Sequence, residues 1–236
     1  MGGVGYLTAQ YLQLVLGLSP LEAGLWMLLP LGVGILSMTL APAIVRRIRP
    51  AFVIAAGLAV AAAGFAVLAQ AGGAAGLAIV VTGLVLAFAG LMPVSALGVD
   101  VVVSAAPPER AGAASAISET TQEFGLALGI AVLGSIATTV YRGTMTDVVP
   151  AGGPSQAAES ARDTLGGATS AADQLPAALL ATARDAFTDG LQLAAAVSAV
   201  ALAGLAVAAA IVLRRVRAGS DPGRTAATND HADALR

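Results

Sequence analysis

Long apolar stretches with almost no charge inside them dominate this sequence. An α-helix needs about 20 apolar residues to cross a hydrocarbon layer about 30 Å thick, and most of these stretches reach that length. The composition, 57% hydrophobic and 11% charged, lies far outside the range of soluble domains. We therefore predict an all-α polytopic membrane bundle of six transmembrane helices. The predicted spans are residues 4–18, 21–45, 51–69, 75–103, 111–140 and 187–213.

The first apolar stretch, residues 4–18, is short for a full crossing and contains Gln10 and Gln13. No arginine-rich leader precedes it, so it does not fit a cleavable signal peptide. It fits better a helix whose beginning is missing.

The arginines indicate how the spans are oriented, because cytoplasmic loops retain basic residues. If the spans alternate, most arginines fall on one side, which we assign to the cytoplasm together with both termini. The opposite side receives a long loop, residues 141–186. Residues 1–217 then form the membrane domain, and residues 218–236 are expected to be a disordered cytoplasmic tail. The arginines on the cytoplasmic side are Arg46, Arg47, Arg49, Arg110, Arg214, Arg215 and Arg217.

Several function classes are excluded by composition. The chain has no Cys, and its single His, His231, lies in the polar tail, so thiolate sites and a membrane-embedded histidine metal site are excluded. A net charge of −2 argues against nucleic-acid binding. No nucleophile elbow, phosphate loop or metalloprotease motif is present. We expect neither an enzyme nor a bound cofactor or metal.

Local signals support the predicted helix boundaries. Ser19 to Glu22 forms an S-x-x-E capping box, which explains Glu22 structurally. Pro30 and Pro93 interrupt predicted spans, and in a membrane such breaks persist where neighbouring helices or a cavity satisfy the freed carbonyls. Gly125-x-x-x-Gly129 and similar spacings in other spans predict closely packed helices.

The long loop contains its own helical signal. Leu175, Leu179, Ala183 and Phe187 recur at four-residue intervals, which predicts a helix over residues 174–189. This helix either rests on the membrane surface or extends the last span outward. Trp26 and Tyr141 lie near span ends, where we expect them to anchor the chain at the membrane interface.

Two acids lie well inside a predicted span. Glu119 and Glu123 are four residues apart and share one face of a helix, about 6 Å apart along its axis. Burial and repulsion between two nearby acids both favour the protonated form, so the pair is a candidate for proton coupling and cation binding. We expect Glu123 to be the coupling residue and Glu119 to lie nearer the cytoplasmic entrance. The alternative is that the first turns of a span this long protrude into water and leave Glu119 an ordinary solvated residue.

Other polar residues are secondary candidates. Asp100 can pair with Arg110 across the short turn between two spans, a structural role that we prefer for it. Gln10 and Gln13, three residues apart, can line a polar cavity or bond between helices.

Three strings of this sequence resemble a known transporter family. They are YLQLVLGLSPLEAGLWMLLP (11–30), APAIVRRIRPAFVIAAG (41–57) and APPERAGAASAISETTQEFGLALGIAVLGSI (106–136). They resemble the C-terminal half of 14-span drug:proton antiporters, the EmrB/QacA-type branch of the major facilitator superfamily. The most specific features are the Pro-Pro-Glu-Arg-x-Gly opening and the E-x-x-x-E face. The likeness extends over nearly the whole chain up to Arg217.

The resemblance implies a fold and a function. The six spans would be the last six of fourteen, built from two inverted three-helix repeats. The protein would expel lipophilic, often cationic, drugs from the cytoplasmic membrane in exchange for protons. Acids of the next-to-last helix act in coupling in this family, and Glu119 and Glu123 are the matching residues here. Glu123 stands where some members have Asp.

The sequence departs from the family in lacking the N-terminal half with its cytoplasmic loop signature. Three interpretations follow: a fragment of a longer product, a half that assembles with a partner, or the product of a decayed gene. The short first stretch favours the fragment. The competing function is a non-transporting membrane subunit or scaffold that needs a partner half and whose acids are structural.

Overall fold

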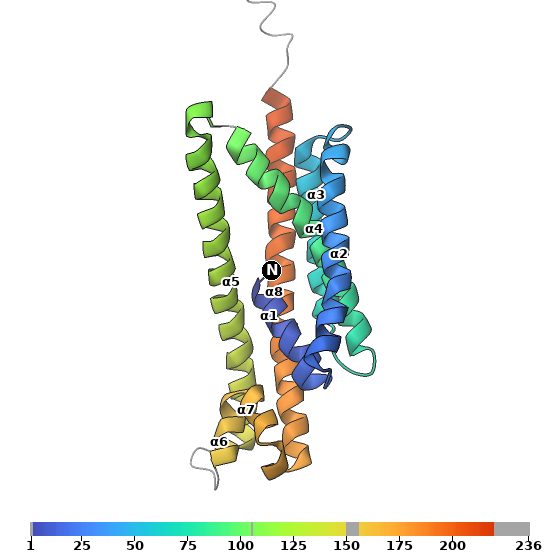
Figure 1. Ribbon diagram of the computed structural model, residues 1–236, viewed down its shortest axis with the longest axis vertical. Coiled ribbons are helices and arrows are strands. Elements are labelled where there is room, and N and C mark those ends of the chain that lie inside the picture. Colours follow the sequence, from blue (N-terminus) through green and yellow to red (C-terminus); the bar gives the residue numbers. More distant parts are fainter. Residues whose placement is uncertain (1, 105, 150–155, 220–236) are drawn as a thin grey trace, which may run out of the picture.

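The chain folds into an elongated bundle of helices that run roughly along one axis (Figure 1). This computed structural model describes residues 2–104, 106–149 and 156–219. The predicted tail, residues 218–236, therefore lies almost entirely outside the described residues. The long helices are α2 (Pro20–Val45), α3 (Pro50–Leu68), α4 (Gly76–Ser104), α5 (Ala111–Val148) and α8 (Ala177–Gly219).

These five helices are long and apolar enough to cross a membrane, which confirms the predicted all-α membrane bundle. The first predicted span takes another form. It consists of α1 (Gly2–Gln10) and a π-helical stretch, η1 (Tyr11–Val15), in which the Leu16 N–H donates to the Tyr11 carbonyl at 3.1 Å. Together they are shorter than a full crossing. A sixth span at residues 4–18 thus stays a prediction.

The helices approach most closely where glycine faces backbone. A Cβ at Gly64 would lie 2.6 Å from the Gly83 carbonyl, and one at Gly90 would meet the backbone of Gly57. Small residues therefore allow α3 and α4 to pack in backbone contact. The predicted Gly125–Gly129 motif is confirmed at one of its two glycines: a Cβ at Gly3 would lie 2.5 Å from the Gly129 carbonyl, whereas in the described chain a Cβ at Gly125 would meet nothing within 4 Å.

Helix α8 is the central support of the bundle and packs on both α3 and α5. Two polar side chains fix it to irregular backbone. The Arg184 Nε donates to the Leu14 carbonyl at 3.1 Å, and the Gln192 amide donates to the Ala71 carbonyl at the end of α3. Both carbonyls lack regular helical partners, so these bonds tie α8 to two turns at the same end of the bundle.

The predicted loop 141–186 is mostly helical. Helix α5 continues to Val148, and the described residues after it form α6 (Gln156–Asp163), α7 (Leu165–Ser170) and a 3₁₀ turn, η3 (Ala172–Gln174). Figure 1 shows α6 and α7 at one end of the molecule, beside α5 and the start of α8. The predicted helix over 174–189 is present from Ala177 onward as the first part of α8, so it extends the last span.

Two local predictions are resolved differently by the structure. The capping box is confirmed, since the Ser19 and Glu22 side chains each accept from the other residue's backbone N–H. Tyr141 is not an interfacial anchor. Its ring is buried, with 3% of its surface exposed, and its hydroxyl donates to the Ala161 carbonyl at 2.6 Å. The tyrosine thus joins α5 to α6.

Candidate functional site

The two predicted acids lie in the first third of α5, after a 3₁₀ turn, η2 (Pro108–Arg110). By the helical rise, Glu119 and Glu123 lie about 12 and 18 Å from Ala111. Both side chains are exposed. In the described part of the chain, neither carboxylate makes a hydrogen bond or an ion pair.

The polar side chains next to the acids form no hydrogen bond with them, because these side chains bond to carbonyls of their own helix. The hydroxyls of Thr120 and Thr121 donate to carbonyls one turn back at 2.8 Å, and the Gln122 amide donates to the Ser118 carbonyl at 3.4 Å. Such bonds let polar residues sit in an apolar helix without other partners. The acids have no equivalent, because a carboxylate cannot donate to a carbonyl.

One face of α5 carries the acids and also makes the helix contacts. Residues separated by alternating steps of three and four lie along one stripe of a helix. We call this stripe the α5 seam. Its members are Glu119, Glu123, Leu126, Ile130, Ala137 and Tyr141.

The α5 seam faces α1 and α8 where it is packed. A Cβ at Gly2 would meet the Leu126 and Ile130 side chains, and a Cβ at Gly190 would lie 2.8 Å from the Ala137 carbonyl. Beyond Leu126 the seam continues to the acids. Figure 1 shows α5 running apart from α8 over this part, with α1 beginning about halfway along the bundle. The acids therefore lie on the same stripe of α5 as its packed residues, at the end where α5 runs apart from α8.

A cleft lies between α4 and α5, at the same level of α5 as the acids but on another face of the helix. It consists of two adjoining hollows of about 320 and 450 Å³ that share Ser95, Val99 and Gln122. The larger hollow also involves α2 and has a volume typical of small-molecule sites. Its lining combines apolar and polar groups, which suits a lipophilic compound with a polar part. Its residues are Met38, Ala41, Pro42, Met92, Ser95, Ala96, Leu97, Val99, Asp100 and Gln122.

The structure separates the remaining predicted site residues. Asp100 lines the larger hollow, whereas Arg110 is exposed on the η2 turn, and no ion pair joins the two. The expected pairing is wrong because the chain between α4 and α5 does not bring the side chains together. Gln13 is exposed in η1, while Gln10 lines a different pocket near Tyr141. Neither hollow is lined by Glu119 or Glu123.

Sequence reasoning missed the cleft itself. Its polar members Ser95, Ser118 and Thr121 are common helix residues with no distinctive spacing. The available signal was Gln122, an amide between the two acids on a different face of the same helix. A polar residue pointing away from the acids indicates a second polar surface on α5.

Comparison with curated proteins finds relatives among resistance and export proteins. The multidrug efflux pump LfrA of Mycolicibacterium smegmatis is 34% identical over 224 residues, 91% of this chain and 44% of its own length. The methyl viologen resistance protein SmvA of Salmonella typhimurium is 34% identical over 197 residues, 78% of this chain and 38% of its own. The tetracenomycin C resistance and export protein of Streptomyces glaucescens is 32% identical over 218 residues, 88% and 40% respectively.

The similarity covers only part of each relative. The chain spans about two fifths of the length of the curated relatives it matches. No protein-family model matches it. The chain is thus a membrane bundle similar to part of several drug-efflux and resistance proteins.

Proposed function

We propose that the chain is the C-terminal half of a proton-coupled exporter of lipophilic or cationic drugs, of the major facilitator type. The observation that carries this proposal is the pair of exposed, unpartnered carboxylates on an apolar helix. An ionisable group is costly in lipid and stays where it meets water, a substrate or another helix. The names of the relatives support export as the process. The chain would have no enzymatic activity of its own.

Within this proposal, Glu123 takes up the proton or the cationic group, and Glu119 lies nearer the cytoplasmic entrance. Glu123 is one turn deeper along α5 than Glu119, farther from the η2 turn. The cleft beside Gln122 would receive the apolar body of the substrate. A second half, contributed by the same polypeptide or by a partner, would close over the exposed side of α5.

The proposed orientation places both termini and the η2 turn in the cytoplasm, and α6 and α7 outside. The chain has no native Cys, so single cysteines report without background. Ser170→Cys in α7 and Glu109→Cys in η2 are both at exposed positions. A membrane-impermeant maleimide added to intact cells should label Ser170→Cys and should reach Glu109→Cys only after permeabilisation. The reverse pattern would overturn the orientation.

Transport is tested by dye efflux and drug resistance in cells, with and without a proton uncoupler. Three proteins are compared: this chain alone, the chain joined to its upstream reading frame, and the joined protein with Glu123→Gln. We expect uncoupler-sensitive efflux from the joined protein and its loss on substitution. Asp147→Asn, an exposed acid near the other end of α5, is the matched control and should leave efflux unchanged.

The other possible outcomes of this experiment would favour one of the alternative functions or remove the role of Glu123. Efflux from the chain alone would show that it assembles into a working transporter without an upstream half. Correct membrane insertion without efflux from any version would favour the non-transporting subunit. Unchanged efflux in the Glu123→Gln protein would remove the coupling role from that residue.

A further inference from the structure

Three arginines occupy the turn between α2 and α3, residues 46–49. Arg46 is the C-cap of α2, Arg49 is the N-cap of α3, and Arg47 lies between them. Figure 1 shows this turn at the end of the bundle opposite α6 and α7. Backbone hydrogen bonds hold the turn, since the Arg47 N–H donates to the Ile44 carbonyl at 3.0 Å and the Phe52 N–H donates to the Arg49 carbonyl at 2.9 Å. All three arginines are exposed, so their side chains extend from a defined turn.

No acid of the described chain neutralises this turn. The turn carries three positive charges and no negative one. Asp100 lines a hollow together with Pro42, one helical turn before Arg46, yet among the described residues no ion pair joins it to an arginine of the turn. Packing of the helices therefore leaves the charge of the α2–α3 turn uncompensated.

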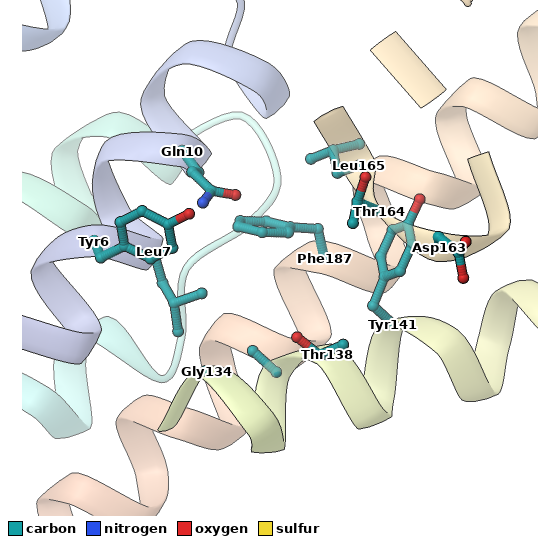
Figure 2. Close-up of a pocket in the computed structure, with 11 residues that line it drawn as sticks. Tyr6, Leu7, Gln10, Gly134, Thr138, Tyr141, Asp163, Thr164, Leu165 and Phe187 are labelled. Carbon is teal, nitrogen blue, oxygen red and sulfur yellow. The ribbon is translucent and has the colours of Figure 1, made fainter. Parts of the chain in front are cut away.

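Two arginines at the opposite end of the bundle, in contrast, have partners in the fold. Arg142 lies 3.4 Å from Asp163, whose carboxylate Figure 2 shows beyond the Tyr141 ring. Arg184 donates to the Leu14 carbonyl at 3.1 Å. These contacts explain the two arginines structurally, and no contact of this kind explains those of the α2–α3 turn.

The length of α3 places the turn at the level of the lipid head groups. Helix α3 is apolar enough to cross a membrane, and its 19 residues span about 28 Å. The hydrocarbon core of a bilayer is about 30 Å thick, so α3 has no spare length that would carry its first residues into water. Arg49 directly precedes α3 and therefore lies at the depth of the lipid phosphates.

Exposed apolar side chains accompany the arginines. Ile44, Ile48 and Phe52 have 40%, 49% and 44% of their surface exposed. Such exposure costs free energy in water, whereas at a bilayer surface apolar side chains enter the edge of the hydrocarbon while arginines reach the head groups. The surface thus fits a molecule that carries an anionic group directly above an acyl chain, which is the chemistry of a phospholipid.

We propose that the α2–α3 turn binds an anionic phospholipid, with the guanidinium groups on its phosphate and Ile48 and Phe52 against the upper part of its acyl chains. A guanidinium group can donate two parallel hydrogen bonds to a phosphate, and basic clusters at the ends of membrane spans attract anionic lipids. A zwitterionic lipid has the same phosphate but also a cation that the arginines repel, so it binds more weakly. This inference concerns the lipid alone and holds whether or not the chain takes part in export.

A tryptophan in the turn can report which lipid lies beside it. The chain has one Trp, Trp26, which lies near the start of α2, far from the turn. Phe52→Trp in a Trp26→Phe background moves this reporter to the first turn of α3. Both proteins are purified and reconstituted into mixed bilayers of phosphatidylglycerol and phosphatidylcholine, one of which is brominated in the upper part of its acyl chains. Bromine quenches a nearby tryptophan, so quenching against lipid composition gives the relative binding constant of the two lipids.

The two reporters should differ. At position 52 phosphatidylglycerol should be preferred at least about fivefold, the ratio expected from one arginine near an anionic surface, and at Trp26 by less than about twofold. Added salt should reduce the preference at position 52, because ions screen exposed charges. Glycerol phosphate, added at constant ionic strength, should not displace the lipid, because it lacks the acyl chains.

Variants with matched charge test the turn itself. In the Phe52→Trp protein, replacing all three arginines of the turn by Gln should lower the preference to less than about twofold, whereas replacing them by Lys, which keeps the charge, should preserve it to within about twofold. Arg47→Gln alone should lower the preference about twofold. Arg110→Gln removes the same charge from another exposed position, in η2, and should leave it unchanged. Circular dichroism and thermal unfolding confirm that each variant is folded.

Four results would overturn the proposal. The first is equal binding of the two lipids at position 52 in the folded protein. The second is the same preference at position 52 and at Trp26, which would make it a general effect of bilayer charge. The third is a preference that survives the three Gln substitutions or falls equally with Arg110→Gln. The fourth is displacement of the lipid by glycerol phosphate, which would make the turn a site for free phosphate compounds.

Discussion

The two ends of α5 present the same seam to very different surroundings. Near Val148 the seam is buried, with Ala137 against the backbone of Gly190 and Tyr141 bonded to α6. Near Ala111 it carries Glu119 and Glu123, and both are exposed. Residues at equivalent positions along one helix stripe therefore have opposite chemistry and opposite packing.

The difference shows what each end contributes. Small and aromatic residues at the packed end gain van der Waals contact and a hydrogen bond, so they stabilise the fold. The carboxylates at the other end, near Ala111, make no such contact within the described chain, so they do not contribute to the stability of the fold. Exposure alone does not distinguish the two acids, because α2 is also largely exposed. The exposed side chains of α2 are mainly apolar, however, and lipid accepts them; examples are Leu25, Leu29 and Ile35.

The largest expected effect is at the contact between α8 and α5. A Cβ added at Gly190 would already lie 2.8 Å from the Ala137 carbonyl oxygen. The larger side chain of Gly190→Leu would therefore clash with this backbone and should destabilise the bundle by about 3 kcal/mol. Unfolding in a denaturing-detergent titration measures it. Gly204→Leu in the same helix is the control, because a Cβ there meets nothing within 4 Å, and it should be tolerated. Equal losses in the two variants would disprove the backbone contact.

The second effect concerns the hydroxyl that joins α5 to α6. Tyr141→Phe leaves the carbonyl of buried Ala161 without this partner and should lower the unfolding free energy by about 1–2 kcal/mol. Cleavage of the α6–α7 segment by protease should become faster as well. Tyr6→Phe removes a hydroxyl from an exposed ring and should change neither quantity. A neutral Tyr141→Phe would mean that another group bonds this carbonyl.

A smaller effect is expected from the ion pair at the same end. Arg142→Gln removes the contact with Asp163, whose side chain is 60% exposed, and should destabilise the chain by about 0.5 kcal/mol. Added salt should reduce even this difference, because screening weakens exposed charge pairs. A large loss that salt does not alter would point to a packing role for the arginine.

The smallest effect is expected at the open end. Glu119→Gln and Glu123→Gln should each change the unfolding free energy by no more than about 0.5 kcal/mol, because neither acid has a partner to lose. Denaturing-detergent titration again measures it. A loss comparable to that of Tyr141→Phe would show that the acids are structural, and the two ends of α5 would no longer differ in kind.

Much of the fold could be predicted because a helix that crosses lipid needs about 20 consecutive apolar residues, which are easily recognised in a sequence. The second, third and fourth predicted spans agree with α2, α3 and α4 to within one residue at each end. Proline and the capping box mark where α2 begins, and apolar length does the rest. The C-terminal ends of α5 and α8 were missed because both helices continue beyond the predicted spans, where polar residues no longer reveal whether a helix goes on.

Part of the candidate site could be proposed from the sequence for the same physical reason. Acids within an apolar helix are conspicuous, so one sequence is enough to single out Glu119 and Glu123, whose role stays a prediction. The burial of Tyr141 could not, because its partner Ala161 is 20 residues away and carries no signal of its own. That Asp100 and Gln122 line one hollow likewise depends on how two helices cross, which the periodicity of either helix does not encode.

The π-helical stretch at Tyr11–Val15 has a consequence for deletions in this part of the chain. A π turn holds one residue more than an α turn, so its five residues cover about the same rotation as four residues of an α-helix. Removing one residue there would restore an ordinary α-helix and leave the residues before it facing nearly the same way. Tyr6 and Gln10 would then stay at the pocket that they line, whereas the same deletion in a regular α-helix would turn them away by about 100°.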